Sequence, residues 1–277
     1  RGHVHRAGHG VDGHAMRDMN HVVGTHDIVL ITIDTLRYDI AATTHTPVLA
    51  GHLPGGRWEA RHAPGNFTYA SHMAMFAGFL PTPTAPGPHP RLFAGRFGGS
   101  ETTTPETWVF DSPDLVAGLA SVGYHTVCIG GVGFFNMRSP IGSVLPGMFA
   151  ESHWEPAFGV TSPTSTRAQV DRAREILDGL APGNRLFLFM NVSALHQPNW
   201  FYGGSTEQDT PTTHAAALRY VDTELEALFD TLRRPSFVIV CSDHGTAYGE
   251  DGYWGHRLGH ETVWTVPYGE FFLEGTA

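Results

Sequence analysis

Hydrophobic residues in this chain gather in short continuous runs, separated by longer segments of mixed polarity. The runs cover residues 27–34, 124–129, 186–192 and 237–241, and each has the length of an ordinary strand. Continuous apolar runs, in contrast to alternating ones, are typical of strands that are buried on both faces. They predict the central strands of a parallel sheet that is covered on both sides.

The segments between these runs carry apolar residues at three- and four-residue spacing, which predicts helices. We expect helices over residues 69–80, 112–121, 166–180 and 213–232, the first of them capped by Thr68. Strands that alternate with helices predict an α/β fold, with a largely parallel, doubly wound sheet and helices on both faces. In such folds the ligand site lies beyond the carboxyl ends of the strands.

Chain length and composition limit the number of domains. The 277 residues suffice for one substantial core, so we expect residues 27–277 to form a single domain. Residues 1–26 hold six of the 18 histidines and show no apolar periodicity, and we interpret them as a flexible, histidine-rich N-terminal segment. Residues 82–110 and 130–165 are rich in glycine and proline and are expected to be long loops.

The charge of the chain narrows the range of partners. A formal net charge of −10 argues against a nucleic-acid partner. No apolar run is long enough for a membrane span and no signal pattern opens the sequence, so we expect no membrane partner and a cytoplasmic location. All 17 basic side chains are arginine, which excludes a mechanism based on lysine. Cys128 and Cys241 lie in predicted strands and are expected to be buried and reduced. The oligomeric state is left open.

Acidic and histidine side chains stand at the ends of three predicted strands. Asp34 ends the first strand, His196 lies shortly after the third, and Asp243 and His244 follow the fourth. Because parallel strands end at the same edge of a sheet, these side chains are expected to converge. Two carboxylates and an imidazole suit a divalent cation such as Zn²⁺ or Mn²⁺.

Five sequence blocks resemble the alkaline phosphatase and sulfatase superfamily of metallohydrolases, and they occur in the order that this superfamily shows. One block alone is a weak signal, whereas five in order are a strong one. The resemblance implies an alkaline phosphatase-like fold. The blocks are Ile31–Asp39, Asn66–Pro81, Gly123–Thr126, Ser242–Gly245 and His256–Pro267.

The resemblance implies that Asp34, Thr68, Asp243 and His244 surround one metal ion, with Thr68 as the nucleophile. At the position of Thr68, sulfatases carry the cysteine or serine that becomes formylglycine, and a threonine cannot be converted to that aldehyde. Sulfatases also place lysines around the sulfate, and this chain has none. Members with threonine at this position are generally phosphoryl-transfer enzymes, so the resemblance indicates phosphate chemistry.

Elementary chemistry agrees with a nucleophilic threonine. Metal coordination stabilises the alkoxide of a hydroxyl that is otherwise a poor nucleophile. The N-terminus of a helix adds backbone N–H groups and the positive end of the helix dipole, which suit a phosphoryl anion. The expected intermediate is a phosphothreonine at Thr68, which water or an acceptor alcohol then releases.

The resemblance favours one metal ion, with two as the alternative. Two-metal members have an aspartate four residues before a histidine, but here Val192 stands four residues before His196. His196 instead resembles the histidine by which one-metal relatives touch the substrate anion. His256 stands where sulfatases have a lysine. It is expected to bind a phosphoryl oxygen, to protonate the leaving group, or to form a second metal site with His196 and His260.

Two further residues flank the expected site in the sequence. Arg37 is predicted either to pair with Asp39 or to clamp a substrate phosphate. His72 stands where sulfatases carry an arginine that supports formylglycine. It is predicted to orient Thr68, to contact the substrate, or to lie on the helix surface.

The sequence therefore predicts a metal-dependent hydrolase of a small-molecule phosphate, phosphodiester or phosphonate ester, from a compact threonine-nucleophile branch of the superfamily. The first alternative is a phosphotransferase or mutase that uses the same phosphothreonine. A sulfatase is a weaker alternative. So is a non-catalytic metal-binding protein, which only the histidines of residues 1–26 support.

Overall fold

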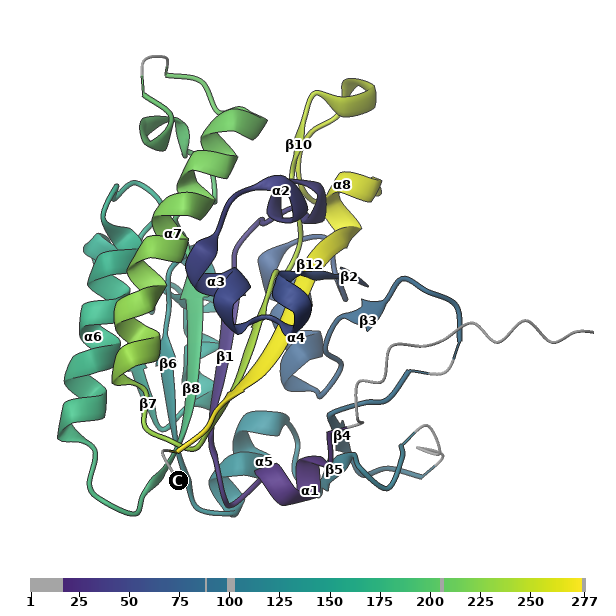
Figure 1. Ribbon diagram of the computed structural model, residues 1–277, viewed down its shortest axis with the longest axis vertical. Coiled ribbons are helices and arrows are strands. Elements are labelled where there is room, and N and C mark those ends of the chain that lie inside the picture. The colour runs from purple at the N-terminus through teal and green to yellow at the C-terminus, as the bar shows by residue number, and fades with distance from the viewer. Residues whose placement is uncertain (1–16, 88, 99–102, 205–206, 276–277) are drawn as a thin grey trace, which may run out of the picture.

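A sheet of eight strands forms the centre of the computed structural model, which describes residues 17–87, 89–98, 103–204 and 207–275. The strands are Asp27–Ile33 (β1), Glu59–His62 (β2), Thr82–Pro83 (β3), Tyr124–Ile129 (β6), Glu151–His153 (β7), Arg185–Val192 (β8), Ser236–Cys241 (β9) and Thr265–Leu273 (β12). Their order is β3-β2-β12-β9-β1-β8-β6-β7. Helices pack on both sides of this sheet, which confirms the predicted α/β fold (Figure 1).

One half of the sheet is parallel and the other half is antiparallel. β9, β1, β8, β6 and β7 pair in parallel, whereas β12, β2 and β3 add antiparallel pairs beyond β9. Every residue of β1 and β9 is buried, which explains their continuous apolar sequences. The sequence did not indicate the antiparallel half, because β12 contains Pro267 and Gly269, residue types that are uncommon inside strands.

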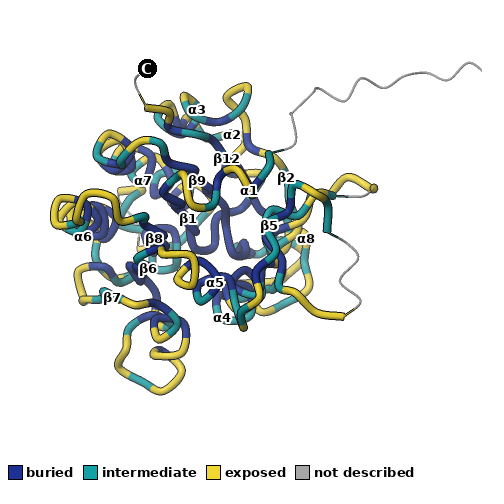
Figure 2. The backbone as a smooth tube through the Cα atoms, turned by 90° about the horizontal axis from the view of Figure 1, so that it is seen from below, coloured by how far each residue is buried: buried dark blue, intermediate teal, exposed yellow. Residues whose placement is uncertain are grey.

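Helices form one layer on each face of the sheet. They are Met19–Val22 (α1), Tyr38–Thr43 (α2), Pro47–His52 (α3), Thr68–Phe76 (α4), Leu115–Ser121 (α5), Ser165–Gly179 (α6), Pro211–Thr231 (α7) and Glu261–Trp264 (α8). On one face, apolar side chains of α2, α3, α6 and α7 pack with strand residues such as Val29 and Ile31. On the other face, α1, α4 and α5 pack with the intervening residues such as Ile28 and Leu30. Figure 2 shows the buried strands at the centre, surrounded by exposed helix backs and loops.

Shorter elements lie between these strands and helices, some of them within residues 82–110 and 130–165, which the sequence indicated as loops. Phe93–Gly95 (β4) pairs with Trp108–Phe110 (β5), and Ala247–Tyr248 (β10) pairs with Trp254–Gly255 (β11). The second pair forms a hairpin that projects beyond the end of the central sheet (Figure 1). The 3₁₀ turns are Pro54–Gly56, Gly133–Phe135, Ile141–Ser143, Pro146–Met148, Pro156–Phe158, Trp200–Tyr202 and Glu250–Gly252.

The N-terminal segment differs from its expectation over residues 17–26. Asp18 caps α1 there, and Met19 and Val22 are buried in the core. The rest of the predicted flexible segment lies outside the described residues. In the part of the chain that the structure describes, no helix is long and apolar enough to cross a bilayer. Both cysteines are buried free thiols, as predicted.

Candidate metal centre

Asp34 directly follows β1, at the edge of the sheet where the parallel strands end. Its backbone N–H donates to the carbonyl oxygen of Val192, at the end of β8, over 3.0 Å. The next residue, Thr35, has a φ of 63°, a left-handed conformation that is unfavourable for a β-branched residue. Such strain clusters at functional sites, and here it turns the chain immediately after the fully buried Asp34.

Asp243 and His244 follow β9, the neighbour of β1. Oδ1 of Asp243 accepts hydrogen bonds from the backbone N–H groups of Thr35 and His244, at 3.3 and 3.0 Å. Nδ1 of His244 lies 2.8 Å from the carbonyl oxygen of Gly245, which places the ring proton on Nδ1 and leaves Nε2 as the ligand atom. The glycine is required by close packing, because a Cβ at Gly245 would lie 1.9 Å from the carbonyl oxygen of Thr262.

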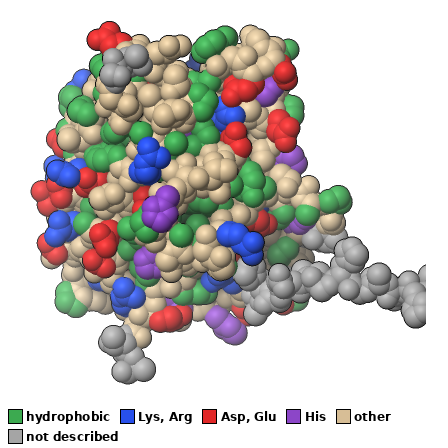
Figure 3. All heavy atoms as spheres, turned by 45° about the horizontal axis from the view of Figure 1, so that its top comes forward, with side chains coloured by type: hydrophobic (Ala, Val, Ile, Leu, Met, Phe, Trp, Pro, Cys, Tyr) green, Lys and Arg blue, Asp and Glu red, His purple; other side chains and the backbone are tan. Residues whose placement is uncertain are grey.

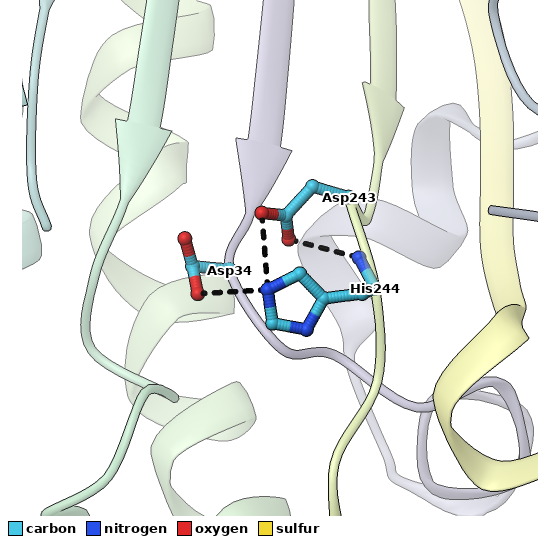
Figure 4. Close-up of side chains that lie close together, drawn as sticks. All are labelled: Asp34, Asp243 and His244. Atoms are coloured by element: carbon cyan, nitrogen blue, oxygen red, sulfur yellow. Dashed lines mark hydrogen bonds and ion pairs between the residues drawn. The ribbon is translucent and has the colours of Figure 1, made fainter. Parts of the chain in front are cut away.

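These three side chains point toward one another (Figure 4). Nε2 of His244 lies 3.9 Å from Oδ1 of Asp34 and 3.5 Å from Oδ2 of Asp243. One potential ligand atom from each residue lies within 4.8 Å of the others, and all three residues are fully buried. Oδ1 of Asp34 and Oδ2 of Asp243 accept no hydrogen bond from any residue that the structure describes. Buried carboxylate oxygens without donors are what a cation site requires.

Burial also shifts the acidity of the two carboxyl groups. It raises the pKa of Asp34 to about 6, and the nearby charge of Asp243 adds to the shift. Burial likewise raises the pKa of Asp243 to about 7. Two ionised carboxylates in this position repel each other, and a divalent cation between them removes that repulsion. Two carboxylate oxygens and one imidazole nitrogen fit Zn²⁺ or Mn²⁺.

Thr68 is the first residue of α4, and its hydroxyl lies at the edge of this cluster. Oγ1 is 3.3 Å from Oδ2 of Asp34 and 3.3 Å from Nε2 of His244. Thr68 does not cap the helix as predicted, because Phe67 occupies the cap position and no side chain caps this N-terminus. The Thr68 hydroxyl is therefore directed at the metal ligands. The backbone N–H groups of the first turn have no acceptor within the helix and can bind an anion.

His72 lies one turn further along α4 and is completely buried. Its Nδ1 is 2.7 Å from the carbonyl oxygen of Thr68, and its Nε2 is 2.9 Å from the hydroxyl of Thr32 in β1. Burial lowers the pKa of His72 to about 3, so the ring is neutral at physiological pH. These contacts agree with a role in orienting Thr68. The alternative of a helix-surface position is wrong, and a fully buried ring is not accessible for the predicted substrate contact.

Asn191, in β8, is a site residue whose role the sequence did not indicate. It stands opposite Thr32 in the parallel register of β1 and β8. Its Nδ2 donates to Oδ2 of Asp34 at 3.1 Å, and its Oδ1 accepts from the backbone N–H of Val132 at 3.0 Å. The one signal in the sequence was a polar side chain near the end of an otherwise apolar strand.

Two histidines extend the cluster on the side of His244. The ring centroid of His256 lies 4.5 Å from that of His244 and 5.5 Å from that of His196. Burial lowers the pKa of His256 to about 3, and its Nδ1 has no hydrogen-bond partner among the described residues. The structure therefore places His196 and His256 next to the candidate metal ligands.

His260 is engaged elsewhere. Its Nδ1 lies 2.8 Å from the hydroxyl of Thr262, where the side chain caps α8, and its Nε2 lies 3.2 Å from Oδ2 of Asp251. With both ring nitrogens occupied, His260 does not complete a second metal site with His196 and His256. The predicted alternative of a second ion therefore lacks its third ligand.

Arg37 is fixed by two carboxylates instead of being free for a substrate. Its guanidinium donates to both oxygens of Asp39, at 2.9 and 2.7 Å, and it also pairs with Glu250. The Glu250 pair ties the segment after β1 to the β10–β11 hairpin. Of the two predicted roles for Arg37, the structural pairing is the one that these contacts support.

The site lies at the end of the sheet that is uppermost in Figure 1 and turned forward in Figure 3. On this face, arginine, acidic and histidine side chains are scattered among hydrophobic and polar ones (Figure 3). A cavity of about 1220 Å³ lies elsewhere, and residues of α1, β2 and β12 such as His21, Arg61 and Glu270 line it. No candidate site residue lines that cavity. The site is therefore assigned from the chemistry of its side chains and not from the position of a cavity.

Comparison with known proteins agrees with the fold and with the motifs. The protein-family model described as Sulfatase matches residues 26–269, most of the chain. No curated protein gives a match.

Solved structures with the same architecture share little sequence with this chain. The C-terminal periplasmic domain of phosphoethanolamine transferase EptC from Campylobacter jejuni is 15% identical, with a TM-score of 0.58 over 90% of this chain and 80% of that chain. The periplasmic domain of EcEptC from Escherichia coli, a complex with Zn, is 13% identical, with a TM-score of 0.57 over 91% and 74%. A protein in the alkaline phosphatase superfamily from Vibrio parahaemolyticus is 17% identical, with a TM-score of 0.55 over 90% and 60%. The fold is therefore alkaline phosphatase-like.

The cytoplasmic location predicted from the sequence is wrong in the light of these comparisons. The two transferase structures are periplasmic domains, and they share the fold of this chain over nine tenths of its length. The lack of a signal pattern in the sequence was not a sound basis for assigning a compartment.

Proposed function

We propose that this chain, which belongs to the sulfatase family, is a metal-dependent phosphoric ester hydrolase with Thr68 as its nucleophile. The observation that carries the proposal is the position of the Thr68 hydroxyl, 3.3 Å from Oδ2 of Asp34 and 3.3 Å from Nε2 of His244. One divalent cation, Zn²⁺ or Mn²⁺, bound by Asp34, Asp243 and His244 would stabilise the alkoxide of Thr68. One ion is proposed because the described residues hold no other such cluster of ligands.

The choice of phosphate over sulfate rests on the identity of the nucleophile and on the absence of lysine from the chain. Threonine cannot become formylglycine, and no lysine is present to bind sulfate. One of the similar structures is a domain of the phosphoethanolamine transferase EptC, and another is the corresponding domain of EcEptC. Both support phosphoryl chemistry on this fold. A negatively charged phosphoryl group also matches the open N-terminus of α4.

The proposed reaction has two steps. Oγ1 of Thr68 gives up its proton and attacks phosphorus, the bond between phosphorus and the leaving-group oxygen breaks, and that oxygen takes up a proton in turn. The first-turn N–H groups of α4, together with His196 and His256, hold the phosphoryl oxygens during this step. Water then attacks the phosphothreonine, restores the Thr68 hydroxyl and releases the phosphoryl group.

Transfer to an alcohol is the second candidate, and the names of the similar structures favour it. Transfer and hydrolysis share the first step, in which phosphothreonine forms at Thr68. They differ only in whether water or an acceptor hydroxyl attacks that intermediate. Both reactions therefore need the same residues, and the acceptor decides between them.

A single set of assays tests the proposal. The purified protein is analysed for metal, then loaded with Zn²⁺ or Mn²⁺ and assayed on nitrophenyl phosphate, bis(nitrophenyl) phosphate, a nitrophenyl phosphonate and nitrophenyl sulfate. We expect turnover of at least one phosphorus ester, with phosphothreonine at Thr68 in acid-quenched digests. Added glycerol would yield glycerol phosphate if transfer competes with hydrolysis. Turnover of the sulfate ester alone, or a phosphorus-ester activity that survives Thr68→Ala unchanged, contradicts the proposal.

A further inference from the structure

Arg257 is an exposed cation that the fold holds beside the nucleophile segment. Its backbone N–H donates to the carbonyl oxygen of Asn66 at 2.8 Å, and Nδ2 of Asn66 donates to the carbonyl oxygen of Leu258 at 3.4 Å. These bonds tie the segment after His256 to the segment before Thr68. Arg257 also has a φ of 69°, a left-handed conformation that its surroundings must impose. Its backbone is therefore fixed relative to Thr68.

The guanidinium of Arg257 has no carboxylate partner in the part of the chain that the structure describes. Its side-chain contact there is the ring of Phe67, whose centroid lies 5.4 Å from Cζ. Arg37, in contrast, is neutralised by Asp39 and Glu250. In a chain without lysine, an unpaired arginine next to the nucleophile segment is a cation ready for an incoming anion.

Arg257 lies at the rim of the site, outside the buried reaction centre. Asp34, Asp243 and His244 are fully buried, whereas Arg257 is exposed. The ring of His256, the residue before Arg257, lies 4.5 Å from that of His244 between centroids, so Arg257 follows directly on a residue that contacts the centre. An exposed cation at this position is placed to contact a substrate outside the atoms that react.

An aromatic wall accompanies this cation. The ring of Phe67, the residue before the nucleophile, lies 6.2 Å from that of Phe134, and the ring of Tyr69 lies 5.7 Å from that of Phe134. All three side chains are half-buried, so each keeps an accessible face. Half-buried rings at a site edge suit the flat or apolar part of a ligand.

We infer that Arg257 and this aromatic wall form a subsite for the unreactive part of the substrate, and that this part carries an anionic group. The inference rests on the proposed function and names its substrate class, phosphoryl esters with a second negative charge beyond an apolar spacer. The reacting phosphoryl group occupies the buried centre, the spacer packs on the rings, and a carboxylate or phosphate binds the fork of Arg257.

Binding of uncleavable phosphonates tests the subsite without turnover. Calorimetry on the metal-loaded protein compares phenylphosphonate with 4-carboxyphenylphosphonate and with 1,4-phenylenebisphosphonate, which separate carboxylate from phosphate as the second anion. We expect the wild-type protein to bind at least one two-anion ligand about tenfold more tightly than phenylphosphonate. Arg257→Gln should abolish the preference and Arg257→Glu should reverse it. Arg57→Gln, which changes an exposed arginine away from the site, should keep it.

Two outcomes overturn the inference. One is the absence of a two-anion preference in the wild-type protein. The other is an equal loss of affinity for all three ligands in Arg257→Gln, which would mean that Arg257 binds the reacting phosphoryl group. Failure of the proposed function looks different: no ester is turned over, while the Arg257-dependent binding preference persists.

Discussion

Nδ1 of His72 lies 2.7 Å from the carbonyl oxygen of Thr68, one turn earlier in the same helix. That carbonyl belongs to the candidate nucleophile, and the other ring nitrogen of His72 reaches Thr32 in the central strand β1. A neutral, fully buried imidazole thus joins the first turn of α4 to the strand that presents Asp34. The contacts of His72 therefore help to fix the Thr68 hydroxyl relative to Asp34.

Replacing His72 should change the rate of the chemical step and leave the metal in place. In His72→Gln we expect kcat to fall by about 10- to 100-fold with little change in KM, because a small displacement of the Thr68 hydroxyl misaligns its attack. Metal content by mass spectrometry should equal that of the wild type. His62→Gln, an exposed histidine in β2, is the control. A rise in KM with unchanged kcat would indicate a substrate contact instead.

Replacing Thr68 separates chemistry from metal binding. Thr68→Ala should lower kcat by about 1,000-fold or more, because the group that forms the covalent intermediate is lost. Thr68→Ser should keep part of the activity, since it retains the hydroxyl at the same position. Both variants should still bind metal through Asp34, Asp243 and His244. Thr223→Ala, an exposed threonine in α7, provides the unchanged reference.

Removing one of the two carboxylates should have opposite effects on stability with and without metal. In excess chelator at pH 8, Asp243→Asn should be about 1–3 kcal/mol more stable than the wild type, because one buried charge and its repulsion with Asp34 are gone. Added Zn²⁺ should raise the melting temperature of the wild type and leave that of the variant almost unchanged. Equal stabilisation of both proteins by Zn²⁺ would remove Asp243 from the proposed site.

Asn191 should act on metal affinity through Asp34. Its Nδ2 is a donor to Oδ2 of Asp34 at 3.1 Å, so Asn191→Leu leaves that oxygen free to rotate away from the ion. We expect metal affinity to fall by about 10- to 100-fold, with most of kcat recovered at saturating metal. Asn136→Leu, which alters an amide outside the metal ligands, should keep the wild-type affinity. A kcat that stays low at saturating metal would place Asn191 in the reaction itself.

A buried histidine outside the candidate metal cluster should contribute to the loss of stability in acid. Burial lowers the pKa of His214 to about 3, and the charge of Arg37 adds to this shift, whereas the charge of Asp39 opposes it. Nδ1 of the ring contacts the hydroxyl of Tyr248. Because this pKa lies below the unfolded value, the stabilisation is complete above pH 6.5 and is lost as the pH falls toward 3.

Urea unfolding at pH 7 and pH 5 measures this effect. The wild type should lose about 2 kcal/mol more than His214→Asn between these pH values, since the unfolded histidine takes up a proton and the folded one does not. His21→Asn, which changes a side chain that is 87% exposed, should follow the wild type. An identical pH dependence in His214→Asn would show that other groups govern the acid loss.

The parts of the fold that the sequence predicted are those where burial alone dictates composition. β1, β8 and β9 are covered on both faces, so their sequences are almost entirely apolar. The residues that follow β1 and β9 lie at the edge of the sheet where Asp34, Asp243 and His244 meet. β12 begins the antiparallel part of the sheet and contains Pro267, so it has no continuous apolar run from which the strand could be predicted.

The roles that the sequence did not reveal depend on contacts between distant segments. Asn191 acts on Asp34 only because β1 and β8 pair in a register that sets Thr32 opposite Asn191. His72 is polar at a helix position that would suit the surface, and its burial follows from packing against Phe135 and Phe189. Neither register nor packing partner can be read from residue spacing along one segment.

The pairing of β1 with β9 has a consequence for how the protein matures. The two strands lie side by side, and the bond between Thr35 and Asp243 spans 208 positions of the chain. β1 therefore leaves the ribosome well before β9 does. Contacts of such long separation form slowly during folding. Until β9 has docked, Asp34 lacks Asp243 and His244, so we expect this site to bind a metal ion only after β1 and β9 have paired.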